Sequence, residues 1–197
     1  MLYRVLAVGD IVGEPGLKHL ERHLRSLQKL KKIDFTVVNG ENASGVGLTP
    51  DQAWRIYDAG ADAVTLGNHT YGKQQIGDFL EDTPWILRPA NYTGRAPGHG
   101  VQVFDMNGVR VRVVNLIGRC DLDWKANDPF TTMDRLLDRE KADFTLVISM
   151  RRQPVRSWRW AIIWMDVYRR SGERIPMCPR RMSGSIPREP ATSRILA

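Results

Sequence analysis

Short apolar runs alternate with amphipathic stretches through the first third of the chain. The apolar runs cover residues 3–8, 33–38 and 63–66, contain β-branched side chains and are bounded by glycine, as buried strands are. Two stretches between them are expected to be helical. Residues 15–31 begin with proline, and residues 50–59 follow a Thr49 cap and stop at Gly60. The order strand, helix, strand, helix, strand predicts an α/β fold built on a parallel sheet.

Further elements follow along the chain. Residues 101–104 and 109–114 flank Asn107-Gly108, a dipeptide that strongly favours a β-hairpin turn. Residues 129–141 carry leucines at helical spacing, and residues 142–147 are expected to form the next strand. A length of 197 residues allows one domain with a sizeable core.

Polar side chains that bind metals follow each of the first three predicted strands. In a parallel sheet the loops that leave the carboxyl ends of neighbouring strands converge on one crevice, so residues thirty positions apart can share a site. The sequence therefore predicts that five residues meet at this edge: Asp10, Glu41, Asn42, Asn68 and His69.

Carboxylate and amide oxygens together with an imidazole nitrogen suit manganese, iron or zinc better than thiophilic metals. A carboxylate can also bridge two ions. In two-metal hydrolases the ions lie about 3.5 to 4 Å apart, polarise a phosphoryl group and lower the pKa of a shared water. A histidine that is not a ligand can then protonate the leaving alkoxide, a role that here would fall to His69.

Each of these fragments also has a simpler interpretation. Asp10 could cap the helix that begins near Pro15, and Glu41-Asn42 could be a solvated turn. Asn68 could sit in a left-handed loop conformation. The placement of all three fragments at successive strand ends favours the metal site over these alternatives.

The remaining histidines carry weaker indications. His19 and His23 have the spacing of a metal clamp on a helix, but the leucines around them mark the buried face, so a solvated helix flank is favoured. His99 lies between two glycines after a polar loop; it could touch a substrate, although a turn residue is the better interpretation.

Extended matches connect these fragments to a known family. The segments 35–43, 45–47, 66–69 and 88–92 resemble the YmdB-like bacterial branch of the calcineurin-like metallophosphoesterases, as do Gly118-Arg119 and residues 128–130. The resemblance runs from residue 1 to about residue 147. Tyr71-Gly72 stands where the branch more usually has tryptophan and aspartate, which puts local substrate contacts in question but leaves the ligands unchanged.

The resemblance implies an αββα sandwich that lacks part of its carboxyl-terminal side. It also implies a centre of two divalent ions, with iron or manganese as the expected metals and zinc as an alternative. It implies hydrolysis of phosphodiesters such as 2′,3′-cyclic nucleotides. By the same likeness Asp10 and Asn42 bind one ion and Glu41 bridges both. Asn68 binds the second ion and His69 donates the proton.

The family pattern also requires three histidines in its carboxyl-terminal half, one in Asp-Phe-His-Ala-Glu-Ala-Thr-Ser-Glu-Lys and two in Gly-Thr-His-Thr-His. No histidine follows His99 in this chain. Residues 148–197 instead contain eleven arginines, no lysine, three acids and three tryptophans. Residues 1–147 hold 18 of the 29 basic and 19 of the 22 acidic side chains, so the net charge of +7 belongs to the tail.

An arginine-rich, lysine-free composition is what a shifted reading frame of a GC-rich gene produces. In the shifted frame, each new codon consists of the last base of one codon of this chain and the first two bases of the next codon. Read in this way, the gene from residue 148 onward can encode Phe-His-Ala-Glu-Ala-Thr-Ser-Glu-Lys. Residues 172–180 admit Gly-Thr-His-Thr-His-Val-Pro-Thr in the same frame, with the valine forced by Met177-Cys178. We therefore expect a slip of one base near Val147.

Residues 1–147 are accordingly expected to be the metallophosphoesterase core, and residues 148–197 an out-of-frame tail without a selected fold. Two rival interpretations are a nucleic-acid-binding protein that uses the tail arginines and an inactive remnant. The charge partition argues against nucleic acid as a partner. Two cysteines imply no disulfide framework, and a cytoplasmic protein without a membrane segment is expected. A small phosphate ester is the expected partner, and a homo-oligomer is left open.

Overall fold

A computed structural model of the protein describes residues 3–119, 126–137, 142–152 and 161–169. Its first sheet has four parallel strands in the order β1-β2-β3-β4, as the alternation of strands and helices predicts. The strands are β1 (Val5–Val8), β2 (Phe35–Asn39), β3 (Ala63–Thr65) and β4 (Ile86–Leu87).

A second, mixed sheet has the order β5-β6-β7-β8. The pair β5/β6 is antiparallel, β6/β7 is parallel and β7/β8 is antiparallel. The turn between the first two strands has the expected hairpin geometry, with positive φ angles of 53° at Asn107 and 85° at Gly108. The strands are β5 (Val101–Met106), β6 (Val109–Ile117), β7 (Phe144–Arg152) and β8 (Ala161–Arg169).

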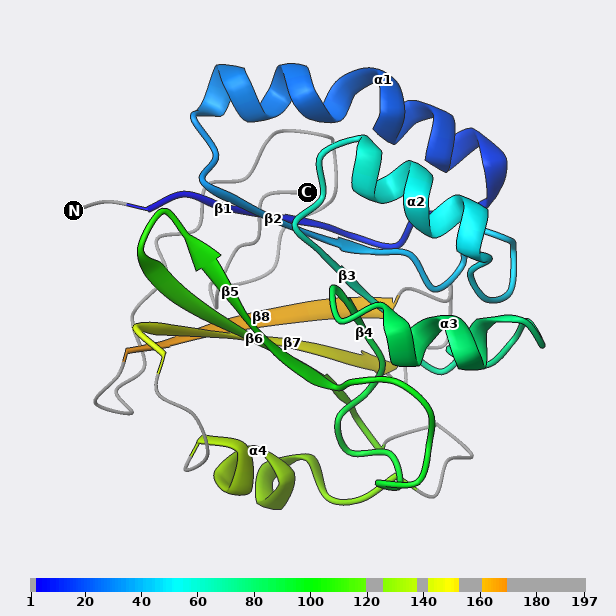
Figure 1. Ribbon diagram of the computed structural model, residues 1–197, viewed down its shortest axis with the longest axis vertical. Helices are drawn as coiled ribbons and strands as arrows, with labels where there is room; N and C mark the ends of the chain where they lie inside the picture. The colour runs from blue at the N-terminus through cyan, green and yellow to red at the C-terminus, as the bar shows by residue number, and fades with distance from the viewer. Residues whose placement is uncertain (1–2, 120–125, 138–141, 153–160, 170–197) are drawn as a thin grey trace.

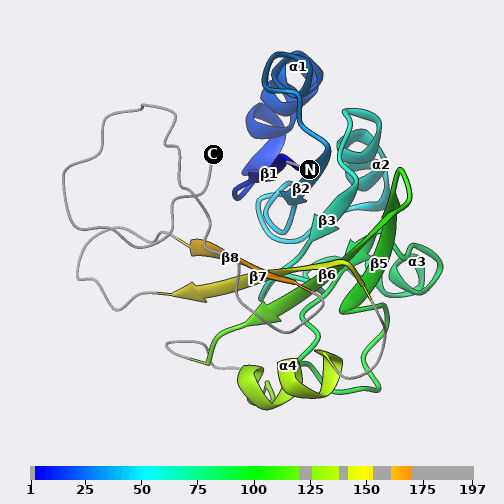
Figure 2. The ribbon, with the colours of Figure 1, turned by 90° about the vertical axis from the view of Figure 1, so that its left-hand side faces the viewer.

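Helices cover the outer faces of both sheets. Figures 1 and 2 show α1 and α2 over the first sheet and α4 on the far side of the second. The helix α3 contributes to the same apolar cluster as α1 and α2. The fold is therefore the α/β architecture with layers αββα that the family resemblance implies. The helices are α1 (Gly13–Lys31), α2 (Pro50–Asp58), α3 (Ile76–Asp82) and α4 (Pro129–Leu137).

Three apolar layers hold this arrangement together because neighbouring residues of a strand point to opposite faces. In β1, Leu6 packs under the helices while Ala7 faces the second sheet. In β7, Leu146 belongs to the layer between the sheets while Val147 packs toward α4 with Met133. Strands buried on both faces need continuous apolar runs, which is the pattern in the sequence.

The two outer helices of the first sheet begin differently. The helix α2 has a complete capping box, in which Thr49 Oγ1 accepts from the backbone nitrogen of Gln52 and Gln52 Oε1 accepts from that of Thr49. The helix α1 starts after Val12, and no side chain caps it. The alternative in which Asp10 caps this helix is therefore wrong.

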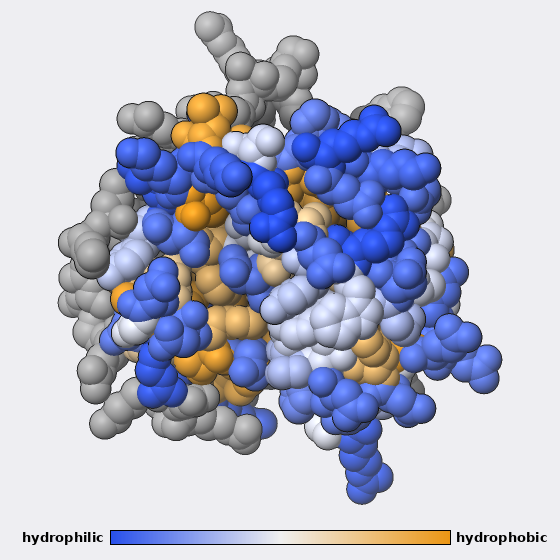
Figure 3. All heavy atoms as spheres, turned by 45° about the horizontal axis from the view of Figure 1, so that its top comes forward, coloured by the Kyte–Doolittle hydropathy of each residue, from blue (hydrophilic) through white to orange (hydrophobic). Residues whose placement is uncertain are grey.

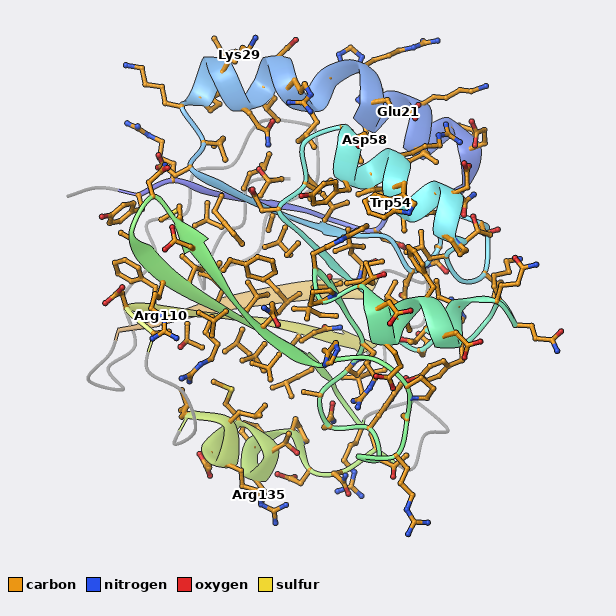
Figure 4. All side chains as sticks on the ribbon, viewed as in Figure 1. Glu21, Lys29, Trp54, Asp58, Arg110 and Arg135 are labelled. Carbon is orange, nitrogen blue, oxygen red and sulfur yellow. The ribbon has the colours of Figure 1, made fainter. Side chains whose placement is uncertain are left out.

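Polar contacts join α1 to α2 on the surface. Arg25 donates from Nη2 to the carbonyl oxygen of Asp58 at 2.7 Å, and Arg55 forms salt bridges with Glu14 and Glu21. Figure 4 shows Glu21 on α1 near Asp58 and Trp54 on α2. Mostly hydrophilic side chains cover this face, with apolar residues visible between them (Figure 3).

Several elements differ from the sequence-based expectation. The helix α3 and the two-residue strand β4 were not expected, and β7 continues to Arg152 instead of stopping at 147. Ile148 is buried between the two sheets. The division into a core of 1–147 and a tail of 148–197 stays a prediction, since residues 153–160 and 170–197 lie outside the described part. Residues 138–141 at the end of the third expected helix, 129–141, lie outside it as well.

The proposed contact of nucleic acid with the tail arginines also falls largely on residues outside the described part. Within the described residues, no helix combines the length and the apolar character that a membrane span requires.

Candidate metal centre

The loops that leave β1, β2 and β3 are tied together at the carboxyl edge of the first sheet. The backbone nitrogen of Ile11 donates to the carbonyl of Asn39 at 3.0 Å, and that of Gly13 donates to Asn42 at 2.9 Å. The nitrogen of Gly40 donates to Thr65 at 3.0 Å. These bonds extend the parallel pairing past the strand ends, so the polar residues that follow are held at one edge.

A chain of side-chain hydrogen bonds joins all three loops. Asn42 Nδ2 donates to both carboxylate oxygens of Asp10, at 3.0 and 2.9 Å. Asn42 Oδ1 lies 2.6 Å from Nδ1 of His69. Since the amide nitrogen faces Asp10, the amide oxygen is the acceptor toward the histidine, which places the imidazole proton on Nδ1 and leaves Nε2 for proton exchange.

Glu41 lies beneath this chain. Its side chain is only 1% exposed, and its Oε2 accepts a hydrogen bond from the backbone nitrogen of His69 at 3.3 Å. The solvated-turn alternative for Glu41-Asn42 is therefore wrong. Asn68 precedes His69 in the same loop and is half-buried. Its φ is not positive, so the left-handed alternative is wrong as well.

The electrostatics of the cluster suit a cation. Burial raises the pKa of Asp10 above its ordinary value, and the Asn42 hydrogen bond and His69 only partly oppose this effect. Among the residues that the structure describes, no lysine or arginine forms an ion pair with Asp10. Two poorly solvated carboxylates joined to the amide of Asn42 and to His69 therefore fit a hard or borderline divalent ion.

The ligand set depends on the asparagines. Within the described ranges, no three His, Cys, Asp or Glu side chains form a group that could hold a metal ion by themselves. The ligand set expected from the sequence accordingly includes the amide oxygens of Asn42 and Asn68, and it stays a prediction.

Three residues that support the centre were not identified as such from the sequence. Tyr92 donates from its hydroxyl to the carbonyl of Gly67 at 3.2 Å; burial, and secondarily the nearby Glu41, raise its pKa. The buried Arg88 donates to carbonyls of the loop that follows it, among them Gly98 at 3.0 Å. Both residues belong to the segment 88–92, which resembles the family and was the sequence feature that could have identified them.

The third supporting residue is Asn115, which comes from the second sheet. Its side-chain nitrogen donates to the carbonyl of Leu66, the residue directly after β3, at 2.6 Å and to that of Leu87, the last residue of β4, at 2.7 Å. The side chain is fully buried, and Leu66 directly precedes the loop that carries Asn68 and His69. Asn115 therefore fixes this loop against the second sheet.

The other histidines do not join the centre. His19 and His23 are exposed on α1, with ring centroids 4.4 Å apart and an angle of 44° between the ring planes, which confirms the helix-flank interpretation. His99 pairs through its backbone with Leu87, and its Nε2 lies 3.2 Å from the carbonyl of Glu81.

The sequence of this chain matches a known protein family and a named bacterial relative. The model of the family described as YmdB-like protein matches residues 6–150. A Bacillus subtilis protein named 2′,3′-cyclic-nucleotide 2′-phosphodiesterase is 42% identical over 135 residues, which are 68% of this chain and 51% of that protein. The chain thus spans about half the length of this relative.

Two solved structures share the fold. One is a protein of Thermus thermophilus described as hypothetical, with 35% identity and a TM-score of 0.70 over 76% of this chain and 58% of that one. The other is described as a novel phosphatase from Mycoplasma pneumoniae, with 25% identity and a TM-score of 0.70 over 77% and 56% of the two chains.

Proposed function

The chain belongs to the YmdB-like protein family, and on that premise we propose that it is a metal-dependent phosphoesterase that hydrolyses phosphodiesters such as 2′,3′-cyclic nucleotides. The observation that carries this proposal is the hydrogen-bonded chain Asp10–Asn42–His69 above the buried Glu41. The name of the Bacillus subtilis relative supports the substrate class.

Four residues would hold two divalent ions, iron or manganese in first place and zinc as an alternative. Asp10 and Asn42 would bind one ion, Asn68 the other, and Glu41 both. An amide oxygen has two lone pairs, so Asn42 can accept the hydrogen bond of His69 and still act as a ligand. When bound, such ions polarise the phosphoryl group and lower the pKa of a water molecule.

His69 is the proton donor in this proposal. Asn42 holds Nδ1, so the ring cannot turn freely and Nε2 faces the reaction. For His69 to act as the acid, Nε2 must carry a second ring proton, which passes to the leaving alcohol oxygen and leaves the neutral ring with its proton on Nδ1. The buried Glu41 accepts a hydrogen bond from the backbone nitrogen of His69 and so holds the backbone of that residue in place. The three loops would thus position His69, the proposed general acid, beside the proposed metal ligands.

We also propose that residues 148–197 are read out of frame, so that this chain is impaired for lack of three histidine ligands. The composition of the tail and the two family motifs in the shifted frame support this, and the family match ends at residue 150. Sequencing the gene across the codons of residues 146–150 tests the slip directly. If independent isolates show no base gained or lost at these codons, the proposed slip in the reading frame is wrong.

Replacing His69 by glutamine in the frame-corrected chain should lower hydrolysis of a 2′,3′-cyclic nucleotide by roughly 100-fold, because its alkoxide leaving group needs a proton. Hydrolysis of bis-p-nitrophenyl phosphate should fall far less, since p-nitrophenolate leaves without protonation. Steady-state rates of both reactions with Mn²⁺ check this difference, with His99→Gln as the control. Equal losses on both substrates would contradict the role of His69 as the acid.

A further inference from the structure

Each of the three loops at the metal centre carries one exposed apolar side chain. Seven large apolar side chains are exposed among the described residues, and three of them lie on these loops. Val12 follows Asp10, Val46 follows Asn42, and Tyr71 follows His69. The polar centre therefore has an apolar rim, defined here as Val12, Val46 and Tyr71.

The contacts between the loops place these residues together. Val12 pairs through its backbone with Asn42. A Cβ on Gly72 would lie 3.1 Å from Cγ1 of Val46, so the loops that carry Val46 and Tyr71 are in contact. The backbone nitrogen of Gly72 also donates to the carbonyl of His69 at 2.9 Å, which turns the chain tightly at Tyr71.

Tyr71 is the aromatic member of the rim, and its ring is held in place. Its hydroxyl donates to the carbonyl of Pro97 at 2.7 Å, and its ring lies 6.3 Å from that of Tyr92 with an angle of 33° between the planes. The hydroxyl of Tyr92 in turn donates to Gly67, next to the ligand loop. Tyr71 nevertheless keeps 38% of its surface exposed.

Tyr71 therefore offers a fixed, partly exposed aromatic ring two residues after His69, on a loop of the proposed centre, and such a ring suits a ligand whose aromatic group is attached to its phosphate. Stacking on such a ring tolerates every base because each base has a π face. We propose that Tyr71 is the residue that selects nucleotides among phosphate esters, by stacking on the nucleobase while the phosphate lies at Asp10, Asn42 and His69. This inference rests on the proposed function of the centre.

The test compares binding of adenosine 5′-monophosphate and ribose 5-phosphate to the full chain, by saturation-transfer NMR titration at a Mg²⁺ concentration high enough to load a weak site. The two ligands share the phosphate and the sugar and differ in the base. The nucleotide should bind roughly tenfold more tightly. Tyr71→Ala should abolish this preference without weakening ribose 5-phosphate, whereas Tyr71→Phe should keep most of it because the ring remains.

Tyr57→Ala is the matched control, because Tyr57 is also an exposed tyrosine but lies on α2 outside the three loops. Preservation of the nucleotide preference in Tyr71→Ala would overturn the inference. Equal affinities of the two ligands for the unaltered chain would also overturn it, while leaving the proposed function intact. Absence of binding for both ligands would contradict the inference and the proposed phosphate-binding centre together.

Discussion

Correcting the frame by one base near Val147 is expected to raise Mn²⁺- or Fe²⁺-dependent phosphodiester hydrolysis by at least about 1,000-fold over the present chain. The proposed centre would draw its oxygen ligands from Asp10, Glu41, Asn42 and Asn68. Without the imidazoles that the family resemblance requires, metal should bind loosely, because affinity grows with the number of correctly placed ligands. The rates of hydrolysis of bis-p-nitrophenyl phosphate and of a 2′,3′-cyclic nucleotide measure the difference.

Two controls make this comparison decisive. The corrected chain should lose its activity with a chelator and regain it on addition of Mn²⁺, which separates metal dependence from a contaminating enzyme. The two chains should also be compared for folded content by circular dichroism. Equal activity of the present and corrected chains would show that the missing histidines are dispensable.

Replacing Glu41 by glutamine in the corrected chain is expected to lower kcat/KM by roughly 1,000-fold. Substituting a residue that only supports a ligand costs about 10–100-fold, and a ligand shared by two ions should cost more. The amide has nearly the shape of the carboxylate and can still accept from the backbone of His69. The melting temperature should therefore not fall, which distinguishes a lost ligand from a lost fold.

Glu81→Gln provides the matched control, because Glu81 is an exposed glutamate on α3. Both variants change one carboxylate into an amide, and only the one at the centre should affect turnover. Full activity in Glu41→Gln would remove Glu41 from its bridging role.

The parallel sheet could be predicted from the sequence because its strands are buried on both faces. Such strands need unbroken apolar runs, and the helices between them carry local signals such as the Thr49 capping box. The strand β4 could not be predicted, since two residues have no periodicity and Ile86-Leu87 become a strand only by pairing with β3. The seven-residue helix α3 is likewise short for a periodicity signal.

The candidate ligands could be placed from the sequence because the ends of parallel strands share one edge. The residues that support them could not. Asn115 reaches Leu66 across 49 positions and between two sheets, and no local pattern encodes such a contact. Tyr92 belongs to the 88–92 motif, but nothing local to that motif predicts its contact with Gly67, which lies 25 positions away.

The most direct test of the metal centre is a titration of the ¹⁵N-labelled chain with Mn²⁺, because the ion broadens the signals of nuclei close to it. The proposed centre predicts early, selective loss of the amide signals around Asp10, Glu41-Asn42 and Asn68-His69. Signals of α4 on the opposite side of the second sheet should persist. Early loss at His19 and His23 on α1, with the three loops unaffected, would contradict the centre.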